Sequence, residues 1–235
     1  EDANLDKYAP YDFIKITPAH LTLLQHRIRT ANGSLLTKRL VLGGEALLAG
    51  QFSYPVNEGL DVEIINEYGP TEATVGCFVF SFQTIGDHEK LSNGISIGKP
   101  IDNVQLHILG ADKELVPLGV TGELCIGGAG LARSYLNRPD LTEEKFVKDP
   151  FNAGSKIYKT GDLARWLPDG NIEYLGRKDD QVKIHGYRIE LGEIERELQQ
   201  SGLVEHSVVL AREDSGGSKR LVGEVVVKGS LEKQA

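Results

Sequence analysis

Three apolar, strand-like runs in the first 95 residues each end in a glycine- or proline-containing turn, and helical patterns separate them. The run at 11–17 precedes Pro18, after which Leu21, Leu24 and Ile28 share one face of a helix predicted over 18–29. The segment 39–47 combines a buried strand, a Gly-Gly turn and the start of a second helix. Strands that alternate with helices favour an α/β layer with a parallel sheet.

The pattern changes near residue 95. Short runs with frequent Gly, Asp and Asn follow, and "LPDGNIEYL" places Asp-Gly between two strand-like runs, which is a hairpin signal. Residues 96–178 are therefore predicted to form antiparallel strands curled into a small β-barrel. After that, a helix that ends at Gly202 and two further strands predict a small α+β domain over 179–235.

Composition excludes several classes of function. The 235 residues carry a net charge of −8 and no basic run, which argues against nucleic-acid binding. No apolar stretch approaches the length of a membrane span, and the acidic N-terminus has no signal-peptide pattern. Cys77 and Cys125 form no disulfide or metal framework, so a cytoplasmic location is expected. The chain contains no Met, and residue 1 is therefore not expected to be a natural start.

The turn "NEYGPTEAT" concentrates polar groups directly after the apolar run "VEII". Gly-Pro forces the chain out of the strand and exposes the following backbone N–H groups. Tyr68 offers a flat face for a purine, and Thr71 offers a hydroxyl for a phosphate. Glu72 supplies a hard oxygen of the kind that Mg²⁺ uses together with phosphate oxygens. The turn is therefore predicted to hold a nucleotide, although an ordinary strand-to-helix turn would also fit these residues alone.

A second candidate site is Asp162 in "KTGD". A carboxylate at such a turn can accept two hydrogen bonds from a ribose diol. The simpler interpretation of Asp162 is that it caps a turn. For Arg177, later in the same stretch, the simpler interpretation is a surface ion pair.

Four motifs together resemble adenylation domains of nonribosomal peptide synthetases, a family related to acyl-CoA synthetases and luciferases. They are "YGPTE", "GELCIGGAGLARSYLNRPDLTEEKF", "YKTGDLARWLPDGNIEYLGR" and "QVKIHGYRIELGEIE". They occur in the order of the family and span most of the chain. The segment "GGAGLARSYLNRPDLTEEKF" is interpreted as structural, without a catalytic residue.

The resemblance implies a role for each matching residue. Asn66 would face the adenine amino group, Tyr68 would stack on the adenine, and Thr71 would contact the α-phosphate. Glu72 would help to hold Mg²⁺. The positions implied near the ribose and the phosphates are Asp162, Tyr174 and Arg177.

The resemblance also implies the domain organisation. Residues 1–178 would be the C-terminal part of the large adenylate-forming domain, and 179–235 the beginning of a small mobile domain. Asp179 would be the hinge between an adenylating and a thioester-forming pose, and Lys183 and Gly186 would face the site in the second pose.

Parts that the family needs are not found in this chain. The phosphate loop, the aspartate that anchors the substrate's α-amino group and the catalytic lysine near the end of the small domain are expected outside it. The 235 residues alone are therefore expected not to adenylate. A fragment of a longer protein and an adenylation domain interrupted by an inserted domain both fit.

The resemblance also places a substrate pocket. Its positions are Lys15, Val41, Gly43, Glu67, Val75 and Gly76. Two opposite charges suit a carboxamide, because Lys15 can donate to the C=O and Glu67 can accept from the NH₂. Asparagine is the predicted substrate and aspartate the next; a salt bridge without a role in selection is the alternative.

The function that the resemblance implies is formation of an aminoacyl-AMP from ATP with Mg²⁺, followed by transfer to the phosphopantetheine of a carrier protein. An acyl- or aryl-CoA ligase is a second possibility, although Lys15 and Glu67 argue against a fatty substrate. A degenerate, non-catalytic adenylate-binding module is the third.

Overall fold

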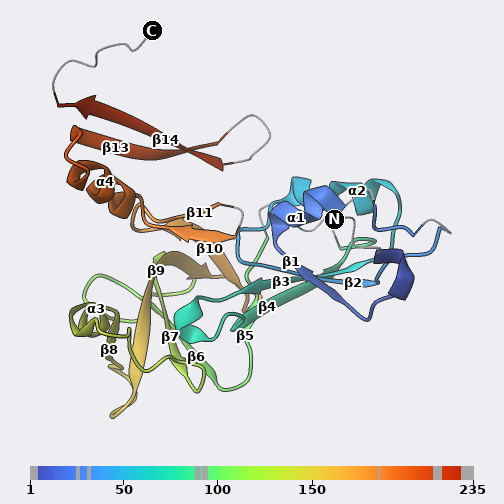
Figure 1. Cartoon of the computed structure of the whole chain (residues 1–235). Coiled ribbons are helices and arrows are strands. Elements are labelled where there is room, and N and C mark those ends of the chain that lie inside the picture. Colours follow the sequence, from blue (N-terminus) through green and yellow to red (C-terminus); the bar gives the residue numbers. More distant parts are fainter. Residues whose placement is uncertain are drawn as a thin grey trace, which may run out of the picture. The chain divides into compact units, whose positions relative to one another are not determined.

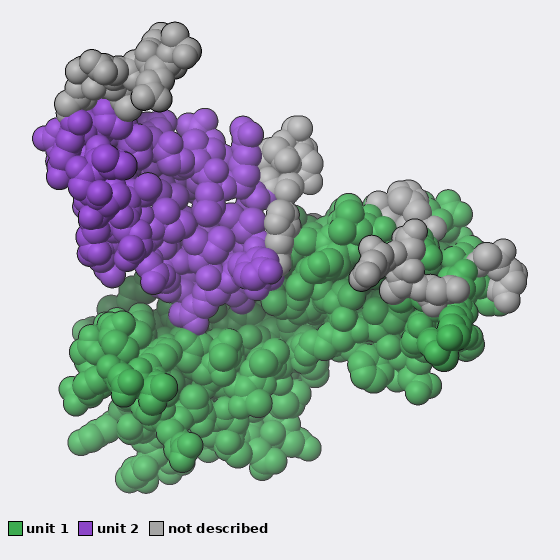
Figure 2. All heavy atoms as spheres, in the orientation of Figure 1, with its two compact units in different colours: residues 1–178 green, residues 179–235 purple. Residues whose placement is uncertain are grey.

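A computed structural model describes residues 5–24, 27–30, 33–87, 91, 95–184, 186–213 and 219–228. The chain divides into two compact units, Glu1–Lys178 and Asp179–Ala235 (Figure 2). No helix among the described residues is both long enough and apolar enough to cross a membrane.

A five-stranded sheet in the first unit has the order β1-β2-β3-β4-β5 (Figure 1). Its strands are β1 Ile14–Ile16, β2 Arg39–Gly43, β3 Glu63–Tyr68, β4 Phe78–Gln83 and β5 Lys99–Pro100. The predicted parallel arrangement is confirmed for β1, β2 and β3. It is wrong for β4, which pairs antiparallel with β3. Strand β5 lies in the region predicted to be antiparallel and does pair antiparallel with β4, although it belongs to this sheet and not to the predicted barrel. The connection from β3 to β4 covers only residues 69–77, whereas a parallel crossover needs about a dozen residues or more.

Short helices cover one face of this sheet. They are α1 Pro18–Leu24, η3 Ala49–Phe52 and α2 Ser53–Asn57, and a 3-10 turn η1 Leu5–Tyr8 precedes β1. Leu21 of α1, Leu42 of β2 and Ile64 of β3 are fully buried together. Because side chains alternate along a strand, the residues between these apolar positions point to the opposite face.

Neither of the two helices predicted in this region has its predicted bounds: the first ends earlier, and the second begins later. Helix α1 ends at Leu24. Ile28 is buried outside it in the hydrophobic core, and its carbonyl accepts a hydrogen bond from the Leu36 N–H. The second helix does not start directly after β2. Gly44 has a φ of +90°, and the first helical turn begins only at Ala49.

The second sheet of this unit is antiparallel, with the order β10-β9-β7-β6 and β8 paired to β9. Its strands are β6 Val104–Leu109, β7 Gly122–Gly128, β8 Phe146–Lys148, β9 Lys156–Trp166 and β10 Ile172–Arg177. Helix α3 Pro139–Lys145 leads into β8. The described strands form a half-barrel in place of the predicted barrel, and the Asp-Gly hairpin between β9 and β10 is confirmed. Ile108, Leu124 and Ile172 form its core together with Phe78 of the first sheet.

The described part of the second unit contains two β-hairpins and one helix. The first hairpin pairs β11 Val182–Ile184 with β12 Tyr187–Ile189, and the second pairs β13 Val204–Glu213 with β14 Lys219–Val227. Helix α4 Leu191–Gln200 packs on β13, and Glu195 Oε1 accepts a hydrogen bond from the Val209 N–H at 2.8 Å. Gly202 has a φ of +79° directly after the helix, as expected of a helix stop.

Both cysteines are predicted to resist alkylation in the folded protein. Each is 1% exposed, and burial raises the pKa of both the Cys77 and the Cys125 thiol to about 12. Because the thiolate is the nucleophile, iodoacetamide at about pH 8 should leave both intact in the native protein and label both in guanidinium chloride. Peptide mapping by mass spectrometry measures this, with free glutathione as the reactive control. Native labelling at either position would contradict the burial seen here.

Candidate functional site

The turn after β3 is forced into an unusual backbone. A Cβ at Gly69 would lie 1.6 Å from the Val75 carbonyl oxygen, so only glycine fits there. Thr74 and Val75 both have a φ of +63°, which costs a non-glycine residue about 1–2 kcal/mol each. Such strain persists only where surrounding contacts fix the backbone, and it is typical of functional sites. The 3-10 turn η4 Thr71–Ala73 lies between these positions.

The turn presents Thr71 and Glu72 differently. Thr71 is exposed, so its hydroxyl can reach a ligand. Glu72 is 6% exposed, and its Oε1 accepts a hydrogen bond from the Tyr135 hydroxyl at 2.5 Å. A nearly buried carboxylate oxygen suits a hard cation that also binds phosphate oxygens. Among the described residues, no group of three or more His, Cys, Asp or Glu is placed to hold a metal.

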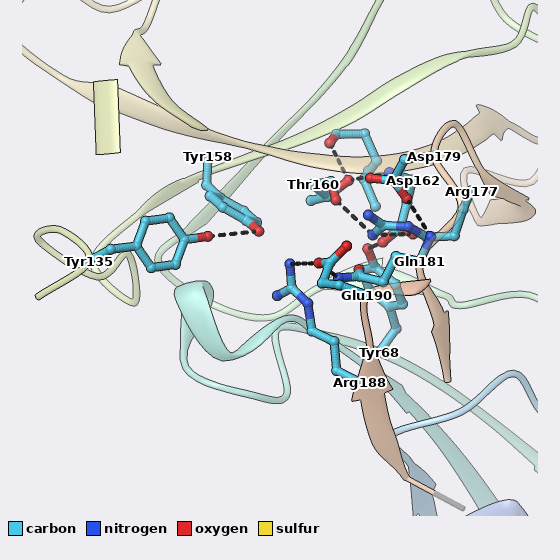
Figure 3. Close-up of polar contacts among 11 residues, drawn as sticks. Tyr68, Tyr135, Tyr158, Thr160, Asp162, Arg177, Asp179, Gln181, Arg188 and Glu190 are labelled. Atoms are coloured by element: carbon cyan, nitrogen blue, oxygen red, sulfur yellow. Dashed lines mark hydrogen bonds and ion pairs between the residues drawn. The ribbon is translucent and has the colours of Figure 1, made fainter. Parts of the chain in front are cut away.

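Asp162 lies in β9 and is 5% exposed. The Tyr68 hydroxyl donates to its Oδ2, and Arg177 Nη1 lies 3.1 Å from its Oδ1 (Figure 3). Arg177 is directly opposite Asp162 in the β9–β10 ladder and also donates to the Thr160 carbonyl at 2.8 Å. A carboxylate has about four acceptor positions, so these two contacts leave capacity for ribose hydroxyls.

The Asp162 contacts fix the Tyr68 ring. Burial, and next the Asp162 charge, raise the pKa of Tyr68 well above its ordinary value, so the phenol stays a neutral donor. The rings of Phe78 and Tyr174 flank it, with centroids 5.6 and 6.2 Å away. Asn66, on the same side of β3, is 4% exposed and donates from Nδ2 to the Ser96 carbonyl at 2.8 Å. Tyr68, Tyr174, Asp162 and Arg177 thus lie together although they are far apart in sequence.

The predicted pocket residues lie mainly on the sheet face opposite the helices. Lys15 pairs with Val41, and Gly43 pairs with Glu67, so all four share that face. Lys15 Nζ lies 2.5 Å from Glu67 Oε2, and the Glu67 side chain is 17% exposed while that of Lys15 is 48% exposed.

Two glycines make room for the Glu67 side chain. A Cβ at Gly76 would lie 1.9 Å from Glu67 Oε1, and a Cβ at Gly43 would lie 3.1 Å from Glu67 Oε2. Val75 is 55% exposed at the end of the strained turn. The sequence did not predict that these glycines leave room for the glutamate, because this depends on contacts between strands and the turn after β3.

In the second unit, Asp179 Oδ1 accepts a hydrogen bond from the Gln181 N–H at 3.3 Å. Lys183 pairs with Arg188 across the β11–β12 hairpin, and Gly186 has a φ of +80° in its turn. Arg188 and Glu190 form an ion pair at 3.7 Å (Figure 3).

Sequence reasoning missed Tyr135 and Thr160. Tyr135 lies in the segment interpreted as structural, yet it contacts Glu72. Thr160 Oγ1 accepts from the Asp162 N–H at 2.9 Å and so orients the backbone at Asp162, which lies in strand β9 and not in the predicted turn. Thr160 could have been found, because it lies in the motif "KTGD" together with Asp162. Nothing in the sequence near Tyr135 indicates its contact with Glu72, which lies 63 residues earlier.

Comparisons with known proteins identify the family of this chain and agree with its fold. A family model described as AMP-binding enzyme matches residues 4–136. Tyrocidine synthase 3 of Brevibacillus parabrevis is 46% identical over 221 residues, which cover 93% of this chain and 3% of that protein. The chain belongs to the AMP-binding enzyme family.

Solved structures narrow the class within that family. A holo nonribosomal peptide synthetase protein with adenylation and PCP domains, bound to a vinylsulfonamide inhibitor, matches with a TM-score of 0.81 and 27% identity. The match covers 95% of this chain and 38% of that one. A four-domain nonribosomal peptide synthetase bound to AMP and glycine matches with a TM-score of 0.62 and 36% identity, over 97% of this chain and 16% of that one. The predicted resemblance to part of an adenylation domain of this type is confirmed.

Proposed function

We propose that this chain provides part of the nucleotide and substrate site of an adenylation domain. The complete domain would convert an amino acid and ATP into aminoacyl-AMP and pyrophosphate. It would then transfer the aminoacyl group to the phosphopantetheine thiol of a carrier protein. The observation that carries the proposal is the buried Asp162 carboxylate, held between Arg177 and Tyr68, the last residue of the strand before the turn that is strained at Thr74 and Val75.

Each residue at this site has a role in the proposal. Asp162 accepts hydrogen bonds from the ribose hydroxyls, and Tyr68 offers its fixed aromatic face to the adenine, with Tyr174 beside it. Asn66 contacts the adenine amino group through its side-chain oxygen, since its nitrogen is bonded to Ser96. Arg177 provides a positive charge that its contact with Asp162 keeps in position.

The phosphate groups of ATP are assigned to the η4 turn. Thr71 donates its hydroxyl to an α-phosphate oxygen, and Glu72 binds Mg²⁺. Bound Mg²⁺ would neutralise phosphate charge as pyrophosphate leaves. The buried position of Glu72 fits a single carboxylate ligand that shares the ion with the nucleotide.

The second unit is proposed to be the beginning of the small mobile domain. The division between the compact units falls between Lys178 and Asp179, which supports a hinge at Asp179. Lys183 and Gly186, on the β11–β12 hairpin, would face the site during thioester formation.

Asparagine is the proposed amino acid, with aspartate next. The Lys15 ammonium can donate to the side-chain carbonyl, and the Glu67 carboxylate can accept from the amide NH₂. A fatty or aryl substrate would desolvate both charges without using them, which is costly. Glu67 would repel the side-chain carboxylate of aspartate.

The partners follow from the same proposal. The chain spans 3% of tyrocidine synthase 3 and 38% of the solved adenylation–PCP chain, so a carrier protein and neighbouring or inserted synthetase domains are proposed partners. A cytoplasmic location fits the use of ATP and the two free, buried cysteines.

Amino-acid-dependent ATP–pyrophosphate exchange tests the adenylation step. The complete domain should catalyse exchange, and these 235 residues purified alone should not, because the phosphate loop and terminal lysine are not among them. A complete domain that binds ATP but exchanges with no amino acid would favour a non-catalytic module. Product release as a CoA thioester would favour a CoA ligase.

A further inference from the structure

The segment after β7, residues 129–136, makes three hydrogen bonds with the η4 turn and the residue that follows it. The Ala132 N–H donates to the Glu72 carbonyl at 2.8 Å, and the Thr74 hydroxyl donates to the Gly130 carbonyl at 2.6 Å. The third contact is the one from the Tyr135 hydroxyl to Glu72 Oε1 at 2.5 Å. The first two fix the backbone of the turn, and the third reaches the side chain that the proposed function assigns to magnesium.

Tyr135 itself is held firmly. Its N–H donates to Thr142 Oγ1 at 3.0 Å, which ties it to helix α3. Its ring meets that of Phe146 edge-on, with centroids 5.4 Å apart, and its hydroxyl lies 3.4 Å from that of Tyr158 (Figure 3). With its backbone tied to helix α3 and its ring and hydroxyl each in contact with another aromatic residue, Tyr135 can hold the carboxylate that it contacts in one rotamer.

The Tyr135 hydroxyl is the donor in its contact with Glu72, and Glu72 Oε1 is the acceptor. Groups that hydrogen-bond a ligating carboxylate fix its orientation, and their loss typically weakens metal affinity about 10- to 100-fold.

We propose that Tyr135 is a positioning residue that holds the Glu72 carboxylate in the orientation in which it binds the magnesium of the ATP complex. This inference rests on the proposed function of Glu72. It assigns a role to residues 128–136, which the sequence alone indicates only as structural.

The test is Tyr135→Phe in the complete domain, because it removes only the hydroxyl. Mn²⁺ affinity in the presence of a non-hydrolysable ATP analogue, measured by electron paramagnetic resonance, should weaken about 10- to 100-fold. The Mg²⁺ concentration for half-maximal pyrophosphate exchange should rise in parallel, while the KM for the amino acid stays within about twofold. Tyr8→Phe removes a hydroxyl from a tyrosine that is 68% exposed, and should change neither quantity.

The outcomes separate the inference from the proposed function. If Tyr135→Phe lowers the melting temperature but leaves Mn²⁺ affinity unchanged, Tyr135 is only structural and the inference is wrong. Glu72→Gln, measured in the same way, tests the magnesium assignment itself. If Glu72→Gln leaves Mn²⁺ affinity unchanged, the assignment of Glu72 to magnesium is wrong. If Glu72→Gln weakens Mn²⁺ affinity but Tyr135→Phe does not, only the positioning role of Tyr135 is wrong.

A second variant decides the matter if Tyr135→Phe does not fold. Thr142→Val removes the acceptor of the Tyr135 N–H without touching Glu72. A smaller weakening of Mn²⁺ affinity in the same direction supports the inference, and unaltered affinity contradicts it.

Discussion

Asp162→Ala in the complete adenylation domain is expected to raise the ATP concentration for half-maximal pyrophosphate exchange by roughly 30- to 1000-fold. Two hydrogen bonds between ribose hydroxyls and a charged carboxylate would be lost, together worth roughly 2–4 kcal/mol. The Tyr68 hydroxyl and the Arg177 guanidinium would lose their acceptor as well, so the melting temperature should also fall. ATP-dependent exchange rates and thermal unfolding measure the two effects.

Two comparison variants isolate the contribution of the Asp162 charge. Asp162→Asn keeps the size of the side chain and one carbonyl acceptor, so its effect on ATP should be intermediate. Asp112→Ala removes an exposed aspartate from the turn after β6 and should leave ATP dependence unchanged. If Asp162→Ala lowers the melting temperature while the ATP requirement stays normal, Asp162 is a structural partner of Tyr68 and Arg177 and does not bind the ribose.

Glu67→Ala is expected to weaken asparagine activation by roughly 1–3 kcal/mol, a loss of about 5- to 150-fold in kcat/KM. Lys15 would lose the partner that lies 2.5 Å away, and the substrate amide would lose its acceptor. Glu67→His should relieve the repulsion of a carboxylate and shift preference toward aspartate. Competition among the twenty amino acids in the exchange assay measures both changes.

Gly76→Ala tests the same pocket without removing a charge. The new Cβ would lie 1.9 Å from Glu67 Oε1, so the carboxylate would have to move and asparagine activation should fall as in Glu67→Ala. Glu63→Ala is the matched control on β3, since Glu63 pairs with Arg39 at 2.7 Å in a half-exposed ion pair of small energetic value. Its substrate preference should match that of the unaltered domain.

Preference of the unaltered domain for a hydrophobic or aromatic amino acid would show that the Lys15–Glu67 pair is structural. The adenylation assignment would survive that result, because it depends on Tyr68, Thr71, Glu72 and Asp162. A site with paired donors and acceptors rejects analogues that lack them by up to about 10⁴-fold, so the competition experiment should give a clear answer.

Local sequence patterns sufficed for much of the fold. The strands β1, β2 and β3, the β9–β10 hairpin and helix α4 follow from residue periodicity and turn residues, which act over a few positions. The errors arose at short connections. The Ile28 carbonyl accepts a hydrogen bond from the Leu36 N–H outside the predicted helix, and the short connection after β3 makes β4 antiparallel.

The sequence by itself determined the family and the order of its motifs, because these are written in contiguous residues such as "YGPTE" and "KTGD". Only the tertiary structure decided which side chains touch. Tyr68 meets Asp162 across 94 residues, and Tyr135 meets Glu72 across 63. The room that Gly76 leaves for Glu67 also depends on how the turn folds back on β3. Such contacts depend on strand register and on close approach of the backbone, which no local pattern specifies.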